Sequence, residues 1–451
     1  MSCRDVPHLR KDHLVGMWTP RGRRKAGGAR CPMVWRPPQD PSFDTSPKPL
    51  LEEVVGTMTI KKQLVILGAG IGGLSVLKEL AAAGVSTADL DVTIVDDDFA
   101  HFLGFTLPWV MRGWRDEDSI PIRPNTQALQ GIRTVTGSVH HVDPNAHTVT
   151  LTDSTVITFD ALIIATGARN AVDQIPGLQR AVDGGTAVHY YSADAAADAH
   201  RALTGFTGGR LMFLVTSAPY RCPVAPYEGA LLAADLLQDK GSRSATTIDV
   251  YSPEKQPMPS AGPYAGQELI TMLAGNGIEF HGERSAVNVD GDRRRVEFAD
   301  GSYADFDLLV FIPPHEPAVT LDGDGWISVD AATMQTAHPG IFAIGDAATV
   351  ISPSGRPIPK AAIFAKNGAA AAAQNVLHYL GKTDHANPIS GEGYCFIDTG
   401  SHTSAQGKGD FFGLPHPAIH LTAPSAALHH DKQQEEDDWR ALWEAEPVAA
   451  N

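Results

Sequence analysis

The sequence predicts an α/β protein with two Rossmann-like, three-layer domains and a short C-terminal extension, and three observations support this fold class. An apolar strand pattern runs into a glycine-rich turn and then a helical pattern over residues 61–83. The order of strand, turn, helix and strand returns over residues 208–251, and a later buried strand ends at Asp346. Strands that alternate with helices in this way indicate parallel sheets covered by helices.

The first turn has the spacing that a nucleotide pyrophosphate requires. In the run KKQLVILGAGIGG, Gly68 permits a tight turn, Gly70 lets the backbone approach the phosphates, and Gly73 lets the helix pack against the strand. The phosphates would lie at the helix N-terminus, where free N–H groups favour negative charge. The next strand ends at Asp96, which we assign to a ribose hydroxyl. A glycine turn beside a solvated acidic strand end is the alternative.

Composition and charge exclude several classes of function. The chain has 451 residues, of which 43% are hydrophobic and 20% charged, as in a soluble globular protein of two or three domains. Residues 1–57 carry 10 basic and 6 acidic side chains, so the remaining 26 basic and 46 acidic side chains give the rest a net charge of about −20. This charge argues against nucleic acid as a partner. No apolar run approaches the roughly 18 residues of a membrane span, and no secretory signal is expected.

The proline-rich residues 1–57 have no periodicity. We expect them to be disordered, or to precede the true start of the protein at Met58. Contact of their basic side chains with a membrane or nucleic acid is the alternative.

Four cysteines are present, and none forms a C-x-x-C pair. This excludes the usual zinc and c-type haem patterns and a secreted disulfide framework, so we predict no metal site and a cytoplasmic protein. Cys3 and Cys31 fall in the first 57 residues, which leaves Cys222 and Cys395 as the informative pair.

The other elements of the first unit follow from periodicity. Residues 101–115 are aromatic and irregular, and either lie against a cofactor or form a packed connector. Strands are expected at residues 133–142 and 147–151. A buried strand over residues 159–167 ends in the small-residue turn Ala165-Thr166-Gly167.

The second unit has lost its phosphate loop. A strand at residues 208–217 leads into the turn APYRCPVAP, which contains no glycine. Its prolines remove N–H donors, so a pyrophosphate could not bind there as at the first turn. The other expected elements are helices at 227–240, 260–276, 361–380 and 431–446, and strands at 246–251, 305–313 and 393–398.

Three motifs together resemble the two-dinucleotide-domain flavoprotein disulfide reductase superfamily, a fold of FAD/NAD(P)-binding type: GAGIGG from Gly68, ATG from Ala165 and GIFAIGD ending at Asp346. In that superfamily the first and third motifs hold FAD, and the terminal aspartate meets the ribityl chain. The resemblance implies non-covalent FAD held by Gly68, Gly70, Gly73, Asp96, Ala165, Thr166, Gly167, Gly345 and Asp346.

Domain boundaries follow from the same motifs. We expect an FAD-binding domain in two parts, residues 58–175 and 312–385. Residues 176–311 would form a second nucleotide-type domain with a degenerate phosphate loop, and residues 386–451 a C-terminal interface or tail region.

Within this superfamily, the chain is similar to sulfide:quinone oxidoreductase and the flavoprotein of flavocytochrome c sulfide dehydrogenase. The runs that carry this likeness are RCPVAPYE from Arg221, FTLPW from Phe105, LLVFIPPH from Leu308 and PKA from Pro359. The resemblance implies oxidation of sulfide or a persulfide by a cysteine, with electrons passing through FAD to a quinone or another acceptor. Cys222 matches the family cysteine at this turn, and Cys395 is matched to its late partner.

The chain also departs from these enzymes. Residues 100–145 hold no match to the additional cysteine of many quinone-linked members, and the charge-rich C-terminal run KQQEEDDW does not resemble a membrane-docking helix pair. Peripheral contact with the inner face of a membrane is therefore an open possibility. A homodimer is possible as well.

The candidate catalytic residues have simple physical roles. A helix N-terminus and the adjacent Arg221 would lower the pKa of Cys222, which a reactive thiol needs, whereas a plain buried cysteine is the alternative for both cysteines. Glu228 would relay protons, or else only offset the helix dipole. Lys360 would stabilise reduced, anionic flavin, or else lie exposed.

Two other functions remain open. An NAD(P)H-dependent FAD oxidoreductase of the type II NADH dehydrogenase or ferredoxin reductase kind would need an intact second glycine loop. A flavin-binding redox sensor or interaction protein without turnover also stays open, because the third cysteine of many family members is missing.

Overall fold

The computed structural model describes residues 61–86, 88–323 and 325–444, all within a compact unit that spans Thr59–Asn451. The expectations for residues 1–57 and Met58 lie outside the described residues. Within these ranges the predicted α/β class with two Rossmann-like sheets is confirmed.

The first sheet is fully parallel and has the order β19-β7-β1-β2-β3. Alternate residues of β1 face opposite layers, as the period of a strand requires. Leu64 and Ile66 pack into a cluster with helices α1 and α7, whereas Val65 and Leu67 pack into a cluster with the small antiparallel sheet β4-β5-β6. The elements are β1 Lys62–Leu67, α1 Ile71–Ala82, β2 Leu90–Asp96, β3 Arg133–Thr136, β4 Val139–Asp143, β5 Thr148–Leu151, β6 Val156–Thr158, β7 Ala161–Ile164, β19 Ile341–Ala343 and α7 Ala362–Tyr379.

The second sheet repeats this plan with the order β12-β11-β10-β16-β9, again parallel. Leu211 and Phe213 of β10 face the helices, and Met212 and Leu214 face the antiparallel sheet β13-β14-β15. The elements are α3 Leu178–Asp183, β9 Ala187–Val188, α4 Ala193–Gly205, β10 Gly209–Val215, α5 Ala225–Asp239, β11 Thr246–Tyr251, α6 Pro263–Gly275, β12 Ile278–His281, β13 Ala286–Asp290, β14 Arg295–Phe298, β15 Tyr303–Asp305 and β16 Leu308–Ile312.

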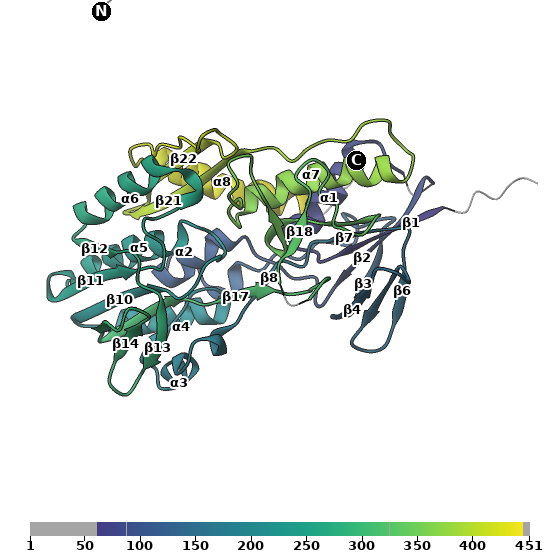
Figure 1. Cartoon of the computed structure of the whole chain (residues 1–451). Coiled ribbons are helices and arrows are strands. Elements are labelled where there is room, and N and C mark those ends of the chain that lie inside the picture. Colours follow the sequence, from purple (N-terminus) through teal and green to yellow (C-terminus); the bar gives the residue numbers. More distant parts are fainter. Residues whose placement is uncertain (1–60, 87, 324, 445–451) are drawn as a thin grey trace, which may run out of the picture. The chain divides into compact units, whose positions relative to one another are not determined.

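Short elements connect the two sheets and complete the chain. Strand β8 pairs with β17, and β18 with β20. The C-terminal hairpin of β21 and β22 contacts α5, and helix α8 packs against this hairpin (Figure 1). The elements are η1 Gly104–Thr106, α2 Leu107–Arg112, η2 Glu117–Ser119, β8 Ala168–Asn170, η3 Val172–Gln174, η4 Arg243–Ala245, η5 Pro259–Ala261, β17 His315–Pro317, β18 Ile327–Val329, η6 Gly345–Ala347, β20 Ala348–Val350, β21 Glu392–Gly400, β22 Thr403–Asp410 and α8 Ala426–Trp443.

Several local features differ from the expectations. The expected strand 133–142 is two strands, because the chain leaves the first sheet after Thr136 and enters the antiparallel sheet at Val139. The expected helix 260–276 is divided at Gly262, whose φ of 87° no helix accommodates. Strand β22 was not predicted. Helix α8 begins five residues early, because the Ser425 hydroxyl accepts a hydrogen bond from the Leu428 N–H.

Among the helices that the structure describes, none has both the length and the apolar character needed to cross a lipid bilayer.

Candidate active site

A cavity of about 550 Å³ gathers the residues that the sequence singled out. Its wall takes residues from the carboxyl ends of β1, β7 and β19, from the turn before α5, and from the C-terminal elements β21 and α8. Of all the predicted site residues, only Gly73 does not line it. The lining set is Gly68, Gly70, Asp96, Ala165, Thr166, Gly167, Cys222, Glu228, Gly345, Asp346, Lys360 and Cys395.

The glycine turn has a distinct steric reason at each position. A Cβ on Gly68, whose φ is +98°, would lie 2.5 Å from the Ala165 carbonyl oxygen. A Cβ on Gly73 would lie 1.8 Å from the Gly68 carbonyl oxygen, so Gly73 packs helix against strand behind the cavity. A Cβ on Gly70 would meet nothing within 4 Å. Gly70 therefore leaves space that a ligand at the N-terminus of α1 can use.

Asp96 holds this turn in shape. One carboxylate oxygen accepts a hydrogen bond from the Ala69 N–H at 2.6 Å, and the other accepts from the N–H groups of Asp98 and Phe99. The carboxylate also faces the cavity, where Asp97 lies beside it. Its predicted ribose contact remains a prediction.

Two buried polar atoms without a partner test whether a dinucleotide fits the cavity. They are Thr166 Oγ1 and His101 Nδ1, and both residues line the cavity. The Trp439 indole can only donate, and its Nε1–H lies 2.8 Å from His101 Nε2. Burial lowers the pKa of His101 to about 4, so the neutral ring carries its proton on Nδ1, where it faces no protein acceptor. Free donors beside an open glycine turn fit the polar groups of FAD.

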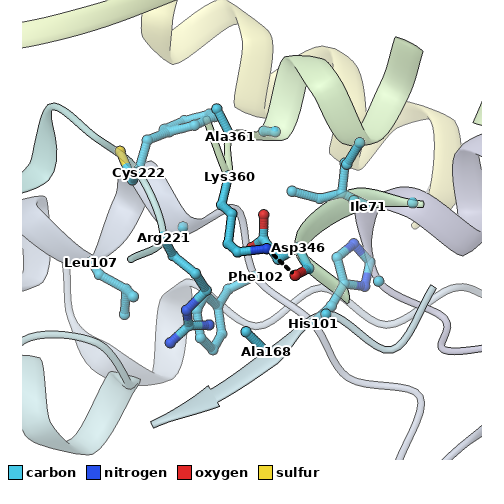
Figure 2. A pocket seen from close by; sticks show the side chains of 18 of the residues that line it. Ile71, His101, Phe102, Leu107, Ala168, Arg221, Cys222, Asp346, Lys360 and Ala361 are labelled. Atoms are coloured by element: carbon cyan, nitrogen blue, oxygen red, sulfur yellow. Dashed lines mark hydrogen bonds between the residues drawn. The ribbon is translucent and has the colours of Figure 1, made fainter. Parts of the chain in front are cut away.

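Lys360 and Asp346 meet at one wall of the cavity (Figure 2). The Lys360 ammonium donates to the backbone carbonyls of Asp346, at 2.7 Å, and Ala348, at 3.2 Å. It also lies 3.6 Å from the Trp326 ring centroid. Burial lowers the pKa of Lys360 to about 8, and it raises the pKa of Asp346. Lys360 is thus a buried cation, and the exposed alternative is wrong.

Cys222 occupies the tight turn before α5 and has a φ of 58° (Figure 2). Its N–H donates to the Lys360 carbonyl at 2.7 Å, and its carbonyl accepts from the Ala225 N–H. Cys395 reaches the same cavity from β21, and both cysteines are free thiols. The cavity therefore brings together two cysteines that lie far apart in the sequence.

The expected lowering of the Cys222 pKa is wrong. Burial raises the pKa of this thiol to about 12, and the Glu228 carboxylate adds to the rise. Burial raises the pKa of Cys395 as well, with the charge of Cys222 as a further cause. Helix α5 begins only at Ala225, and Arg221 is engaged elsewhere, since it donates to the Asn170 side chain and the Tyr191 carbonyl.

Glu228 is 1% exposed, and its surroundings include charges that the sequence analysis missed. The Lys432 ammonium donates to Glu228 Oε1 and, at 2.7 Å, to Asp398 Oδ2. Asp398 also accepts from the Trp109 indole at 2.6 Å. Burial raises the pKa of Glu228 to about 8, against the lowering effect of Lys432. The buried positions of α8 recur at helical spacing, at His429, Lys432, Glu436, Trp439 and Trp443. In the sequence, only the two tryptophans indicate that one face of this charge-rich helix is buried.

The turn of the second unit closes the place where a second dinucleotide would bind. Asp96 is the last residue of β2, and Glu254 lies three residues after the end of β11, so Glu254 is an acid near the place where a ribose-binding acid would lie. The Tyr220 hydroxyl, from the glycine-free turn, donates to Glu254 Oε2 at 2.9 Å. Burial raises the pKa of Glu254 to about 7. Tyr220 of this turn therefore already binds the Glu254 carboxyl group, whereas the turn at Gly70 leaves space for a ligand.

Comparisons with known proteins agree with this architecture. The family model described as "Pyridine nucleotide-disulphide oxidoreductase" matches residues 62–208 and 229–369. The mitochondrial sulfide:quinone oxidoreductase of Dictyostelium discoideum is 24% identical over 306 residues, 63% of this chain and 65% of that protein. The chain thus spans less than two thirds of this relative. The type II NADH:quinone oxidoreductase NdhA of Mycobacterium tuberculosis is 26% identical over 363 residues, 72% of this chain and 74% of that protein.

Among solved structures, the sulfide:quinone oxidoreductase of Aquifex aeolicus superposes with a TM-score of 0.73 at 19% sequence identity, covering 85% of this chain and 92% of that chain.

Cys222, Glu228 and Cys395 lie outside the residues that the family model matches, so the family assignment rests on the remainder of the chain. The model matches more than half of the sequence. Its members are FAD-binding oxidoreductases, which confirms the predicted cofactor and class of enzyme. The chain belongs to the pyridine nucleotide-disulphide oxidoreductase family.

Proposed function

We propose that this flavoprotein oxidises sulfide or a persulfide at Cys222 and Cys395 and passes the electrons through FAD to a quinone or another acceptor. The observation that carries the proposal is the shared cavity: both cysteines line it together with the glycine turn of α1, Glu228 and Lys360. Resemblance to sulfide:quinone oxidoreductases agrees with it.

The proposed reaction proceeds through a disulfide between the two cysteines, which the two thiols form by losing two electrons and two protons. Hydrosulfide attacks the Cys222 sulfur, so that a new S–S bond makes a persulfide on Cys222, the old S–S bond breaks, and Cys395 leaves as a thiolate. This thiolate joins the outer persulfide sulfur in a second S–S bond, which releases one proton and two electrons that bound FAD would accept. Glu228, buried at the same wall, accepts the proton. A second hydrosulfide then removes the bridging sulfur as hydrodisulfide and restores the disulfide between the two cysteines.

The chemistry that bound FAD supplies is acceptance of two electrons and their release to the final acceptor. Gly68, Gly70 and the N-terminus of α1 hold its phosphates in this proposal. The Lys360 ammonium lies just before α7, so the cation and the helix N-terminus together favour negative charge at that wall.

NADH oxidation is the second candidate, because NdhA aligns with 72% of this chain. Against it stands the Tyr220–Glu254 hydrogen bond, which occupies the acid that a second dinucleotide would use. The two functions differ in a single measurable property, the donor that reduces the flavin.

The test is an anaerobic titration of the purified, oxidised flavoprotein, once with sulfide and once with NADH, followed by the visible flavin absorbance. Sulfide is expected to bleach the flavin and NADH to leave it oxidised. Bleaching by NADH alone would overturn the proposal. Adding a short-chain quinone, free or in liposomes that are then floated, identifies whether a quinone reoxidises the protein and whether a membrane binds it.

The pH dependence of the reaction tests the role of Glu228. Its pKa of about 8 lies above the ordinary 4.5, so the side chain is protonated below pH 8 and becomes a base above it. The sulfide-dependent rate is therefore expected to rise with pH through a limb near pH 8. A Glu228→Gln variant should lose this limb and about a hundredfold in rate, the scale of one general base. An unchanged limb in the variant would assign the titration to another group.

A further inference from the structure

Lys432 is a buried cation on the C-terminal helix, within the wall of the active-site cavity. It is 1% exposed and lines the same cavity as Cys222 and Cys395. Its ammonium bridges Glu228 on α5 and Asp398 on β21. The rings of Trp109 and Phe105 lie 5.2 Å and 5.7 Å from it. Residues from α5, β21, α2 and η1 therefore meet at this one charge on α8.

The Asp398 carboxylate has three hydrogen-bond partners besides Lys432. It accepts hydrogen bonds from Trp109, from the Ser404 hydroxyl and, at 2.8 Å, from His429 Nδ1. Glu228, by contrast, has an Oε2 atom without a partner. Lys432 is thus held in place by Asp398 and acts toward Glu228 and the cavity.

Attachment of α8 does not by itself account for a buried lysine. Other contacts hold the helix, among them the ion pair of Lys366 with Glu435 at 2.6 Å and the bonds of Arg440 to the carbonyls of Ser119 and Ile120. An apolar residue at a buried position commonly serves attachment as well as an ion does, because burying a charge costs desolvation. The presence of a charged residue at position 432 is therefore better explained by a role in the active site than by attachment of α8.

The cysteines supply that reason. The positive charge of Lys432 lowers the pKa of Cys222 and of Cys395, against the effects of burial and of Glu228. The local sequence around Cys222 instead predicts that Arg221 and a helix dipole lower the pKa of this thiol.

We propose that Lys432 is a positioning residue of the active site, which orients Glu228 and stabilises sulfur anions on Cys222 and Cys395, so that helix α8 forms part of the catalytic machinery. This inference rests on the proposed function only in taking the two cysteines as the reacting groups. It requires no particular sulfur substrate.

The test is the alkylation rate of the reduced holoenzyme with iodoacetamide at fixed pH, with the modified cysteine identified by peptide mass spectrometry. Lys432→Met is expected to slow alkylation of Cys222 at least about tenfold, equivalent to one unit of thiol pKa. Lys432→Arg keeps the charge and should stay within about threefold of the unsubstituted protein by the same scale. Lys366→Met, the matched control, removes a lysine that also binds α8 but does not contact Glu228, and should change nothing.

An alkylation rate in Lys432→Met within twofold of the unsubstituted protein, with FAD bound, would overturn the inference, as would an equally slow Lys432→Arg. If Lys432→Met does not fold, Glu228→Gln/Lys432→Met removes both charges and is compared with Glu228→Gln alone; the same tenfold decrease is expected there. Because alkylation needs no sulfide, its outcome is independent of the sulfide titration. If sulfide does not reduce the flavin but the tenfold effect on alkylation is observed, the role of Lys432 stands and only sulfide is ruled out as the substrate.

Discussion

Replacing Cys222 with serine is expected to slow sulfide-driven bleaching of the flavin by at least about 10³-fold, the scale on which loss of a nucleophile acts. A serine hydroxyl cannot form the S–S bond on which the proposed reaction depends. The backbone should not change, because the N–H bond to the Lys360 carbonyl and the bond from the Ala225 N–H involve only main-chain atoms of residue 222. FAD should therefore stay bound. The measurement is the anaerobic sulfide titration described above.

Dithionite provides the control, since it reduces flavin without any cysteine and should bleach Cys222→Ser as fast as the unsubstituted protein. A Cys395→Ser variant then separates a cysteine pair from a single nucleophile. It should lose turnover as Cys222→Ser does, because no leaving thiolate remains. Full sulfide turnover in Cys222→Ser would show that the reaction takes place elsewhere, and full turnover in Cys395→Ser would leave Cys222 acting alone.

The part of the site that could be predicted is the part encoded locally. Gly68, Gly70 and Asp96 lie on one strand–turn–helix–strand unit, where sequence spacing fixes the distance in space. The central strands of both parallel sheets could also be predicted, because residues buried on both faces form continuous apolar runs. Residues 159–167 and 208–217 are examples, and the structure has buried strands in both ranges.

The charged wall of the site could not be predicted, because it depends on how the tail folds back. Lys432 and Glu228 are 204 residues apart, and only the packing of α8 against the hairpin joins them. In sequence, Lys432 is one charge in a charge-rich run and resembles a solvated helix face. The same gap explains the error at Cys222: a local pattern suggested a helix dipole, whereas burial by distant elements determines the pKa of the thiol.

A valine at position 70 is expected to abolish tight FAD binding without harming the fold. Gly70 has an extended backbone, with φ −82° and ψ −163°, which any residue can adopt. Its side-chain direction is empty within 4 Å in the protein, so a valine would occupy only the space proposed for the pyrophosphate. We expect FAD affinity to fall at least about a hundredfold, or roughly 2.7 kcal/mol. Titration of the apoprotein followed by flavin fluorescence measures this.

The neighbouring glycine and a distant one separate ligand space from chain strain. Gly73→Ala drives a Cβ to 1.8 Å from the Gly68 carbonyl oxygen, so it should lower the thermal stability of the apoprotein itself. Gly205→Val, at the exposed end of α4, meets nothing within 4 Å and should change neither stability nor affinity. If Gly70→Val binds FAD as tightly as Gly205→Val does, the phosphates lie elsewhere and the cavity holds its cofactor in another way. If the Gly70→Val apoprotein is destabilised as Gly73→Ala is, Gly70 is needed for packing of the turn and not for space for a ligand. Only a stable apoprotein with weakened FAD binding assigns the open space at Gly70 to the cofactor.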